Sequence, residues 1–434
     1  MNVVIIGSGY VGLVSGACFA EFGANVRCVD NDSEKIKKLK NGIIPIYEPG
    51  LQELVNRNLQ NDCLSFHENL KDVISDADLV FIAVGTPTRR GDGHADLKYV
   101  YEVAEEIAKL IHSHIVVVNK STVPIGTARK VKEIITKINP TANIEVASNP
   151  EFLREGSAIE DFMRPDRVVL GVEGENSEKL LKELYRPLNL IETPMITTNL
   201  ETAELIKYAS NAFLATKISF INELSLLAEK TGADIHDVAK GMGLDKRIGN
   251  KFLHVGPGYG GSCFPKDTLA LIRMAEEHEA TSEIIKSVVN VNNSQKLRMI
   301  DKIKNALGGS VSGKRLAILG LTFKPETDDM RDAPSLSIIP NLIEQKASLI
   351  AHDPVGIEEA KKVLPSDLEF SNSIDEAIRD ADAIVILTEW NQYRGLDLER
   401  IKEIMKGNTF IDLRNVYEKA TMIKQGFNYH CIGR

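Results

Sequence analysis

Short apolar runs alternate with amphipathic segments over the first part of the chain. "NVVIIG", "NVRCVD" and "ADLVFIAVGTP" are the first three runs, and the amphipathic stretch 11–22 follows the first of them. "HIVVVNKSTVP" and "IEVASNPEF" continue the series. Continuous apolar strands joined by helices are typical of a parallel sheet that is covered on both faces. The pattern predicts such a sheet within residues 1–197.

The same pattern returns near the C-terminus, in "KRLAILGLTF", "LIAHDP", "DADAIVILTEW" and "TFIDLRN". The third of these runs matches the earlier "DADLVFIAVGT" almost position for position. We infer an internal repeat of two Rossmann-like halves, with the second half at 308–434. The second half carries the charged segment "TFKPETDDMRDAPS" where the first half carries a glycine turn.

The segment between the halves is predicted to be helical. Residues 198–230 contain no glycine or proline and keep apolar residues at helical spacing, which predicts one helix of about 45 Å. A second helical stretch is expected over about 267–307, so that 198–307 forms a central all-α region. The predicted fold class is therefore α/β, with two Rossmann-like parallel-sheet domains joined by a long central helix and a small all-α region.

Composition narrows the class of protein. A chain of 434 residues is expected to form two or three domains. Its net charge of -9 argues against nucleic acid or anionic membrane as a partner. The N-terminus runs into an apolar strand without a basic leader, so we expect a cytoplasmic protein. The five cysteines are scattered without CxxC spacing, which predicts reduced thiols and no metal site.

The segment "IIGSGYVG" has the GxGxxG spacing between a predicted strand and a predicted helix. Its glycines are Gly7, Gly9 and Gly12. They would let the backbone approach a pyrophosphate at the helix N-terminus. Asp30, at the end of the next strand, would accept hydrogen bonds from the ribose hydroxyls, which favours NAD over NADP. Arg27 and Lys35 lie near Asp30 in the sequence, so NADP is not excluded as the cofactor.

Polar residues follow three other predicted strands. The hydroxyls of "VGTPT" and "KSTVPIGT" could line a ligand at the strand ends, although each Thr-Pro pair also suits an ordinary turn. In "NPEFLREG", Glu151 and Glu155 would share one face of a helical turn beside Arg154. Lys207 and Asn211 could form a donor pair on the long helix, the alternative being a surface lysine.

Cys263 lies in the glycine-rich segment "GPGYGGSCFPKD". A structural cysteine normally has bulky apolar neighbours, whereas these neighbours leave the sulfur approachable. Lys266, or a helix beginning near Asp267, would stabilise the thiolate that a nucleophile needs. With an NAD site in the same chain, the nucleophile is the favoured interpretation.

NAD and a thiolate together allow an alcohol to be oxidised past the aldehyde. Cys263 would trap the aldehyde of a first oxidation as a thiohemiacetal, a second NAD would convert it to a thioester, and water would release a carboxylate. Lys207 and Asn211 could stabilise the oxyanions. Asp267 or Glu151 could deprotonate the water.

Five segments resemble those of the UDP-glucose/GDP-mannose dehydrogenase family, in order and spacing, over essentially the whole chain. They are "GSGYVG", "NPEFLREG", "KYASNAFLATKISFINE", "GPGYGGSCFPKD" and "GLTFKPETDDMRDAPS". The resemblance implies an NAD-dependent four-electron oxidoreductase. The C-terminal signature is most similar to bacterial UDP-glucose 6-dehydrogenases, which implies conversion of UDP-glucose to UDP-glucuronate. It also implies a homodimer built on the long helix, or a higher homo-oligomer.

The resemblance assigns residues to three roles. The implied catalytic residues are Cys263, Lys207, Asn211, Asp267, Glu151 and Thr122. The implied NAD contacts are Gly7, Gly9, Tyr10, Val11, Gly12, Asp30, Lys35, Thr86, Thr122, Glu155, Lys266 and Arg331. The implied substrate contacts are Glu151, Phe152, Leu153, Arg154, Glu155, Lys207, Asn211, Phe252, Leu253, His254, Val255, Gly256, Tyr259, Gly260 and Lys324. The second Rossmann half would hold the nucleotide of the substrate.

Three alternatives stay open at this point. The same chemistry could act on GDP-mannose or on a UDP-N-acetylhexosamine. A two-electron dehydrogenase of the 6-phosphogluconate type shares a Rossmann half and a long helix, but it would have no use for the thiol. A non-catalytic nucleotide-sugar sensor would bind its ligand without turnover.

Overall fold

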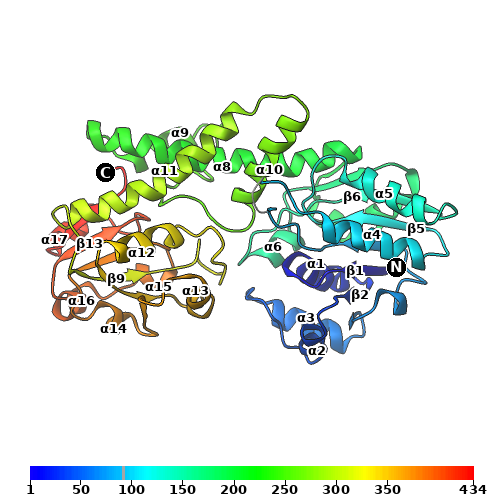
Figure 1. Cartoon of the computed structure of the whole chain (residues 1–434), viewed down its shortest axis with the longest axis horizontal. Helices are drawn as coiled ribbons and strands as arrows, with labels where there is room; N and C mark the ends of the chain where they lie inside the picture. The colour runs from blue at the N-terminus through cyan, green and yellow to red at the C-terminus, as the bar shows by residue number, and fades with distance from the viewer. Residues whose placement is uncertain (90–92) are drawn as a thin grey trace. The chain divides into compact units, whose positions relative to one another are not determined.

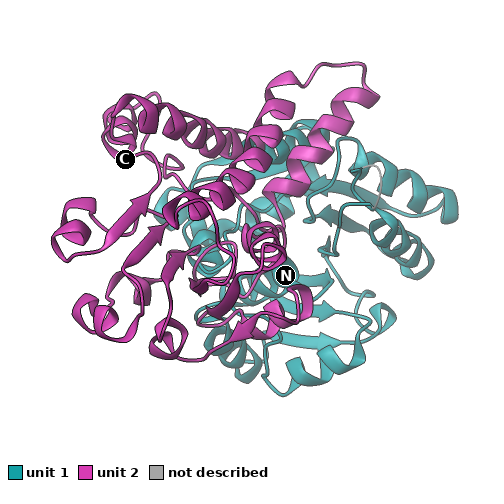
Figure 2. Ribbon diagram, turned by 60° about the vertical axis from the view of Figure 1, so that its left-hand side comes forward, with its two compact units in different colours: residues 1–210 teal, residues 211–434 magenta. Residues whose placement is uncertain are grey.

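The two apolar repeats of the sequence form two separate sheets. The computed structural model describes residues 1–89 and 93–434. It divides into unit 1, Met1–Ser210, and unit 2, Asn211–Arg434, each with its own sheet (Figure 2). The boundary falls within helix α8 (Leu200–Thr231). A separate central part at 198–307 stays a prediction.

Unit 1 contains an eight-stranded sheet with the strand order β3-β2-β1-β4-β5-β6-β7-β8 (Figure 1). The strands are β1 (Asn2–Ile6), β2 (Asn25–Val29), β3 (Leu64–His67), β4 (Leu79–Ile82), β5 (Ile115–Asn119), β6 (Ile144–Ser148), β7 (Val168–Val172) and β8 (Met195–Thr198). The helices before α8 are α1 (Tyr10–Glu21), α2 (Ser33–Lys40), α3 (Leu51–Gln60), α4 (Lys98–Leu110), α5 (Thr127–Ile138), α6 (Ala158–Met163) and α7 (Glu175–Leu184). The first six strands follow the 3-2-1-4-5-6 order of dinucleotide-binding sheets.

The sheet of unit 1 departs from the all-parallel expectation at β7, which pairs antiparallel with β6. The connecting segment 149–167 therefore does not cross the sheet, and it stays at the edge where β6 ends. That edge is formed by the carboxyl ends of β1, β4 and β5, where open α/β sheets bind their ligands. The reversal thus keeps the "NPEFLREG" segment at the ligand-binding edge.

Unit 2 contains a six-stranded sheet in the order β11-β10-β9-β12-β13-β14, with every pair parallel among the described residues. Its strands are β9 (Arg315–Leu319), β10 (Ser348–His352), β11 (Glu369–Phe370), β12 (Ala383–Ile386), β13 (Thr409–Asp412) and β14 (Asn428–Cys431). The helices around it are α12 (Ser335–Glu344), α13 (Ile357–Val363), α14 (Ile374–Ile378), α15 (Asn391–Arg394), α16 (Leu398–Ile404) and α17 (Lys419–Lys424). The order again reads 3-2-1-4-5-6, which confirms the predicted repeat.

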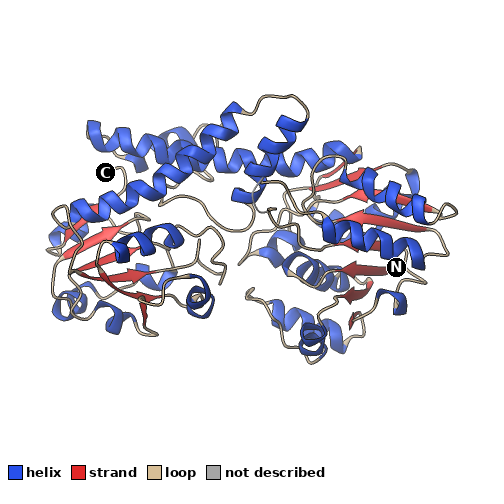
Figure 3. Ribbon diagram, in the orientation of Figure 1, coloured by secondary structure: helices blue, strands red, loops and turns tan. Residues whose placement is uncertain are grey.

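The long helix is confirmed, and the second helical stretch is two helices. α8 runs from Leu200 to Thr231 without a break (Figure 3). α10 (Phe264–Glu277) and α11 (Glu283–Ala306) replace the single stretch expected over 267–307, and α9 (Ile235–Gly243) precedes them. The break falls at Glu279, whose φ of 55° lies in the left-handed region that a right-handed helix cannot contain.

The central strands of each sheet are buried and apolar. All four residues of β4 and of β12 are buried, as the continuous apolar runs predict for strands covered on both faces. Within the part of the chain that the structure describes, no helix combines the length and the apolar character that a membrane span needs.

Candidate functional site

The glycine turn of unit 1 has the geometry of a dinucleotide cradle. Gly7 has a φ of +102°, and a Cβ there would lie 2.6 Å from the Ala83 carbonyl oxygen. A Cβ at Gly12 would lie 1.8 Å from the Gly7 oxygen, so the helix packs directly on the turn. A Cβ at Gly9 would meet no atom within 4 Å. The first and third glycines are therefore required by packing, and the second leaves the space a pyrophosphate needs.

The N-terminus of α1 is open to an anion. Gly9 is its N-cap residue and offers no side chain to the first-turn N–H groups. Such groups, together with the helix dipole, favour a bound phosphate. Tyr10, the first helical residue, directs its hydroxyl to Glu48 instead, and burial together with this hydrogen bond raises the pKa of Tyr10.

Asp30 follows β2 directly and faces the glycine turn. One of its oxygens accepts hydrogen bonds from the Ser8 N–H at 2.8 Å and from the Lys35 ammonium at 3.0 Å. Arg27, which the sequence left as a partner for a 2'-phosphate, instead donates to Asp76 at 2.5 Å. Of Arg27 and Lys35, only Lys35 therefore contacts Asp30. A carboxylate at this position can accept hydrogen bonds from the ribose hydroxyls of NAD.

A threonine pair joins the ends of β4 and β5. The Thr86 hydroxyl donates to the Thr122 carbonyl at 2.9 Å, so the two predicted strand-end residues are brought together. Thr86 is buried and Thr122 is half-buried. The Thr122 hydroxyl belongs to the strand-end loop that precedes α5.

Lys207 and Glu151 form a buried ion pair in unit 1. The ammonium lies 2.9 Å from the carboxylate, and the side chains are 4% and 6% exposed. Burial alone would raise the pKa of Glu151, but the Lys207 charge and hydrogen bond, with the Leu153 N–H, hold that pKa below its ordinary value. Glu151 is therefore held as an anion that can accept a hydrogen bond from a hydroxyl group.

The segment after Glu151 is not helical, so the expectation of a helical turn over "NPEFLREG" is wrong. Residues 151–154 have no regular structure, and α6 begins only at Ala158. The Glu48 carboxylate accepts from the N–H groups of Gly156 and Ala158 and so fixes this irregular path. Glu151 and Glu155 consequently do not share a helical face.

The neighbours of Glu151 have separate environments. The Arg167 guanidinium lies 3.5 Å from the centroid of the Phe152 ring, and Lys207 lies 5.2 Å from it. Arg154 pairs with Asp161 at 2.5 Å. Leu153 packs against the apolar core of unit 1. The roles predicted for Phe152, Leu153, Arg154 and Glu155 stay predictions.

Cys263 is the N-cap residue of α10, so the helix begins immediately after the sulfur-bearing residue. Its side chain is half-buried, and its sulfur lies 3.4 Å from the Ser262 hydroxyl. Pro265 lies in the first turn, where it costs no helical hydrogen bond. A helix N-terminus is one of the environments that stabilise a thiolate.

Asp267 lies one helical turn beyond Cys263 and is fully buried. Its two oxygens accept from the Asn211 amide at 2.6 Å and from the Lys266 ammonium at 2.5 Å. The structure thus brings Asn211, Lys266 and Asp267 together in unit 2. The Lys266 ammonium is bound to its neighbouring carboxylate, and its predicted contact with NAD stays a prediction.

The loop that precedes Cys263 is largely buried. Leu253, Val255 and Tyr259 are 3%, 4% and 6% exposed, so their side chains belong to the core of unit 2, whereas His254 is exposed. Phe252 has a φ of 63° and packs edge-on against Phe264. A substrate contact from Leu253, Val255 or Tyr259 would therefore involve mainly the backbone.

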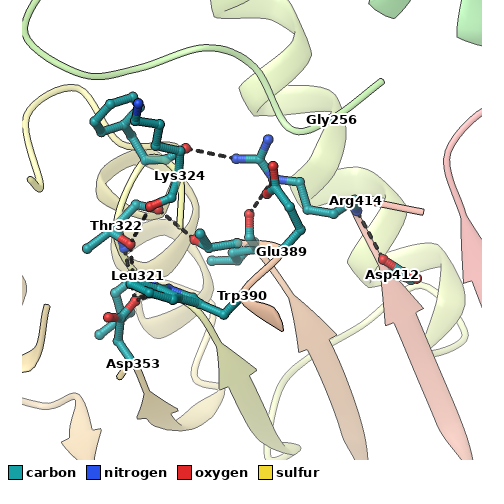
Figure 4. Close-up of polar contacts among 12 residues, drawn as sticks. Gly256, Leu321, Thr322, Lys324, Asp353, Glu389, Trp390, Asp412 and Arg414 are labelled. Atoms are coloured by element: carbon teal, nitrogen blue, oxygen red, sulfur yellow. Dashed lines mark hydrogen bonds and ion pairs between the residues drawn. The ribbon is translucent and has the colours of Figure 1, made fainter. Parts of the chain in front are cut away.

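The ends of the strands in unit 2 carry a polar cluster (Figure 4). Lys324 follows β9, and its ammonium lies 5.4 Å from the Phe323 ring. Arg414 follows β13 and donates to the carbonyl oxygens of Leu387 at 2.7 Å and Phe323 at 3.0 Å. Its guanidinium also pairs with Glu389 at 3.0 Å. Arg331, in the same unit, pairs with Asp329 at 2.8 Å, and its side chain is 62% exposed.

Three polar residues at these sites were not assigned a role by the sequence analysis. Arg414 could have been found as a cation directly after a strand. Lys120 is buried, donates to Asn149 and Tyr185 at 3.0 Å each, and has its pKa lowered by burial to about 7. Glu204 accepts from the N–H groups of Gly126 and Ala128 at the start of α5. Burial raises the pKa of Glu204 to about 7.

Each unit therefore presents a distinct set of chemical groups. Unit 1 offers a dinucleotide cradle and a buried lysine–carboxylate pair. Unit 2 offers a thiol at a helix N-terminus, a buried carboxylate held by an amide, and cations at the ends of its strands.

Family models match almost the whole chain. The NAD binding domain of the UDP-glucose/GDP-mannose dehydrogenase family matches residues 1–189. The central domain of the same family matches 201–294, and its UDP binding domain matches 317–419.

Relatives of known name match over the full length. The chain is 53% identical to the UDP-glucose 6-dehydrogenase of Rhizobium meliloti (strain 1021), with 100% of both chains covered. It is 48% identical to the UDP-glucose 6-dehydrogenase YwqF of Bacillus subtilis (strain 168), with 100% and 98% covered. A solved UDP-glucose dehydrogenase from Pyrobaculum islandicum superimposes with a TM-score of 0.91 at 38% identity, with 99% and 96% covered.

Proposed function

The chain belongs to the UDP-glucose/GDP-mannose dehydrogenase family, and we propose that it oxidises UDP-glucose to UDP-glucuronate with two molecules of NAD. The observation that carries this proposal is Cys263 at the N-terminus of α10, one turn before a buried Asp267. A two-electron dehydrogenase has no need of such a thiol. The names of the full-length relatives support UDP-glucose as the substrate.

The residues of unit 1 would hold the cofactor and the reacting alcohol. NAD, when bound, accepts two electrons and a proton from the substrate carbon. The open backbone at Gly9 would hold its pyrophosphate, and Asp30 would hold the adenosine ribose. Lys207 would stabilise negative charge on the substrate oxygen, since its ammonium is buried and held in place by Glu151.

The residues of unit 2 would carry the covalent step. The Cys263 thiolate adds to the aldehyde carbon, and the resulting oxyanion takes a proton as the thiohemiacetal forms. After the second oxidation, water attacks the thioester, the thiol leaves, and a carboxylate remains. Asp267 would orient that water, because its oxygens are already fixed by Asn211 and Lys266.

The cations of unit 2 would bind the diphosphate of the substrate. Lys324 and Arg414 lie at the carboxyl ends of β9 and β13, where open α/β sheets bind ligands. The Arg414 guanidinium donates to two carbonyl oxygens, and these hydrogen bonds fix its orientation. Binding energy from a remote nucleotide would then orient the sugar alcohol.

The amount of NADH formed per sugar tests this function. We expect two NADH for each UDP-glucose consumed, with UDP-glucuronate as the product. GDP-mannose and UDP-N-acetylmannosamine, at matched concentrations, should give much slower turnover. One NADH per sugar, or faster turnover of either competitor, would contradict the proposal. Binding of UDP-glucose without any NADH would indicate a sensor.

We also infer a homodimer built on α8. Phe213, Phe220 and Leu227 repeat at seven-residue spacing on this helix and are 65%, 48% and 58% exposed. This spacing is the period at which helices pair along an apolar seam. Light scattering of a Phe213→Lys/Phe220→Lys variant should show a smaller species than the wild type. Ile423→Lys, at an exposed apolar residue of α17, is the control and should leave the mass unchanged.

A cytoplasmic location also remains part of the proposal. All five cysteines lie among the described residues, and no disulfide joins them there. Reducing compartments maintain this state.

A further inference from the structure

The loop 253–263 that leads to Cys263 has no helix or strand of its own, although most of it is buried. Buried backbone N–H and C=O groups outside regular structure need other partners. In this loop the partners are side-chain carboxamides. The residues are Asn222 of α8 and Asn292 and Gln295 of α11, which are 0%, 3% and 2% exposed.

The three carboxamides form a clamp on two loop residues. The Gly256 N–H donates to the Asn222 oxygen at 2.9 Å, and the Gln295 amide donates to the Gly256 carbonyl at 2.7 Å. Asn292 accepts from the Tyr259 N–H at 2.8 Å and donates to the Tyr259 carbonyl at 3.1 Å. The backbone of each residue is therefore fixed in both directions, as it would be within a sheet.

The opposite side of the loop is closed by close packing. A Cβ at Gly256 would lie 3.0 Å from the Arg414 guanidinium, beside which Gly256 lies in Figure 4. A Cβ at Gly260 would lie 2.4 Å from the Asp332 carbonyl oxygen, and one at Gly261 would lie 2.8 Å from the Phe323 ring. These glycines let the loop fit between α11 and the loops of the second sheet. Close packing therefore favours glycine at these three positions.

The clamp ends four residues before the nucleophile. From Tyr259 the chain passes through Gly261, whose N–H donates to the Arg331 carbonyl at 2.7 Å, and enters α10 at Phe264. The position of Cys263 is thus fixed by the clamp on one side and by the helix on the other. A shift of about 1 Å in a reacting group can reduce a rate on the order of a hundredfold.

We propose that Asn222, Asn292 and Gln295 are positioning residues that hold Cys263 where it intercepts the aldehyde, which rests on the proposed four-electron function. A thiol that is correctly placed captures the aldehyde before it leaves. When the loop is released, the first oxidation proceeds but part of the aldehyde escapes. The ratio of NADH to sugar consumed then falls below two.

The test compares Asn292→Ala with Asn293→Ala in the full-length protein. Asn293 is the exposed neighbour of Asn292 on α11, so it serves as a matched control. We expect Asn292→Ala to lower kcat on the order of tenfold. We also expect a ratio clearly below two, with free aldehyde trapped by hydroxylamine. Asn293→Ala should give a ratio of two and an unchanged kcat.

A second variant keeps the proposal testable if Asn292→Ala does not fold. Gln295→Met retains the side-chain length and removes only the donor to the Gly256 carbonyl. A ratio of two in every folded clamp variant, whatever the overall rate, would overturn the proposal, because a merely destabilised enzyme slows both oxidations equally. Failure of the proposed function would appear separately, as a wild-type ratio other than two.

Discussion

Two sets of side-chain contacts hold the buried carboxylates of the proposed catalytic residues Glu151 and Asp267. The carboxylate of Glu151 is kept ionised by Lys207, and the carboxylate of Asp267 is held by an amide and an ammonium. A buried charge that loses its partner is strongly destabilising, typically by about 3 kcal/mol or more. A loss of activity in variants of these residues could therefore reflect either a lost catalytic group or a loss of stability. Cys263, which is half-buried and uncharged when protonated, is the cleaner residue for a catalytic test.

Replacement of Cys263 by alanine should abolish formation of UDP-glucuronate. Without the thiol no thioester can form, so at most one NADH should appear for each sugar. NAD affinity should stay within about twofold of the wild type, because the dinucleotide cradle is built by unit 1 residues alone. Product analysis and NAD titration check the two expectations. Wild-type production of the uronate by this variant would contradict the covalent route.

The glycines of the cradle should differ in what their substitution disturbs. In Gly12→Ala the added methyl collides with the Gly7 carbonyl, so we expect a loss of about 2 kcal/mol of stability. In Gly9→Ala the methyl enters open space where the pyrophosphate would lie, so we expect normal folding and NAD binding weakened by about tenfold or more. Thermal unfolding without ligand, together with NAD titration, separates the two effects.

Either of two results would contradict this interpretation of the turn. One is a Gly9→Ala protein that is as unstable as Gly12→Ala. The other is a Gly9→Ala protein that binds NAD with wild-type affinity.

The sequence identified site residues only where the adjacent residues in the chain indicated a loop or the end of a strand. Cys263 was found because glycines surround it, and Asp30 because it ends a strand. Asn292, Gln295 and Glu204 are polar residues on amphipathic helices, where exposure is the usual outcome. Their burial depends on which segments pack against the helix, and spacing within the chain does not contain this information.

Helix α8 is fixed to the sheet of unit 1 by Glu204, one turn before Lys207. Its carboxylate accepts from the N–H groups of Gly126 and Ala128 at 2.6 and 2.9 Å, and from the Ser148 hydroxyl at 3.2 Å. Gly126 and Ala128 lie at the start of α5, which follows β5, and Ser148 is the last residue of β6. One side chain therefore links the helix that carries Lys207 to two strand ends.

The stability of unit 1 should fall as the pH rises through the titration of Glu204. Burial raises the pKa of Glu204 from 4.5 to about 7, so the folded state binds more protons than the unfolded state between these values. The stabilisation is complete below about 4.5 and is lost by about 7, with a total change of about 3 kcal/mol. Glu204→Gln should remove this dependence. Urea unfolding followed by circular dichroism between pH 5 and 8 measures it.

Glu201 provides the control for Glu204 on the same helix. Its hydrogen bond to Arg129 lowers the pKa of Glu201, so its contribution is lost only below the ordinary range of a carboxyl. Glu201→Gln should therefore leave the slope between pH 5 and 8 as in the wild type. An unchanged slope in Glu204→Gln would show that another group titrates.

Elements were predictable where the apolar pattern alone determines them. The strands β1, β2, β4, β5 and β6 of unit 1 and β9, β12 and β13 of unit 2 lie within the predicted runs, β10 begins one residue before its run, and α8 was placed to within two residues. The last strand, β14, was not predicted. The antiparallel β7 was not predicted, because a buried apolar run does not show in which direction it pairs. The break before α11 was missed because Glu279, unlike glycine, is not a residue that marks left-handed backbone.

The same strand order occurs in both units of the molecule. The first six strands of unit 1 and the sheet of unit 2 have the 3-2-1-4-5-6 order. An aspartate directly follows the second strand of each sheet, Asp30 after β2 and Asp353 after β10. Asp30 accepts hydrogen bonds from the Ser8 N–H of the glycine turn and from the Lys35 ammonium. Asp353 is 2% exposed, and its two oxygens accept from the residues that begin the neighbouring loops (Figure 4). The donors are Leu321, Thr322, Val355, Gly356 and Trp390. The aspartate that would bind ribose in one half thus holds loops together in the other.

The two aspartates should therefore respond differently to the same substitution. Asp353→Asn places an amide against N–H donors, so we expect unit 2 to lose about 2 kcal/mol of stability and NAD binding to remain. Trp390 is the only tryptophan of the chain and donates to Asp353 at 3.3 Å, so its fluorescence should change as well. Asp30→Asn should leave this fluorescence unchanged and weaken NAD binding by about tenfold, which corresponds to about 1.4 kcal/mol. If Asp353→Asn weakened NAD binding as strongly as Asp30→Asn, the assignment of the cofactor to the first half would be wrong.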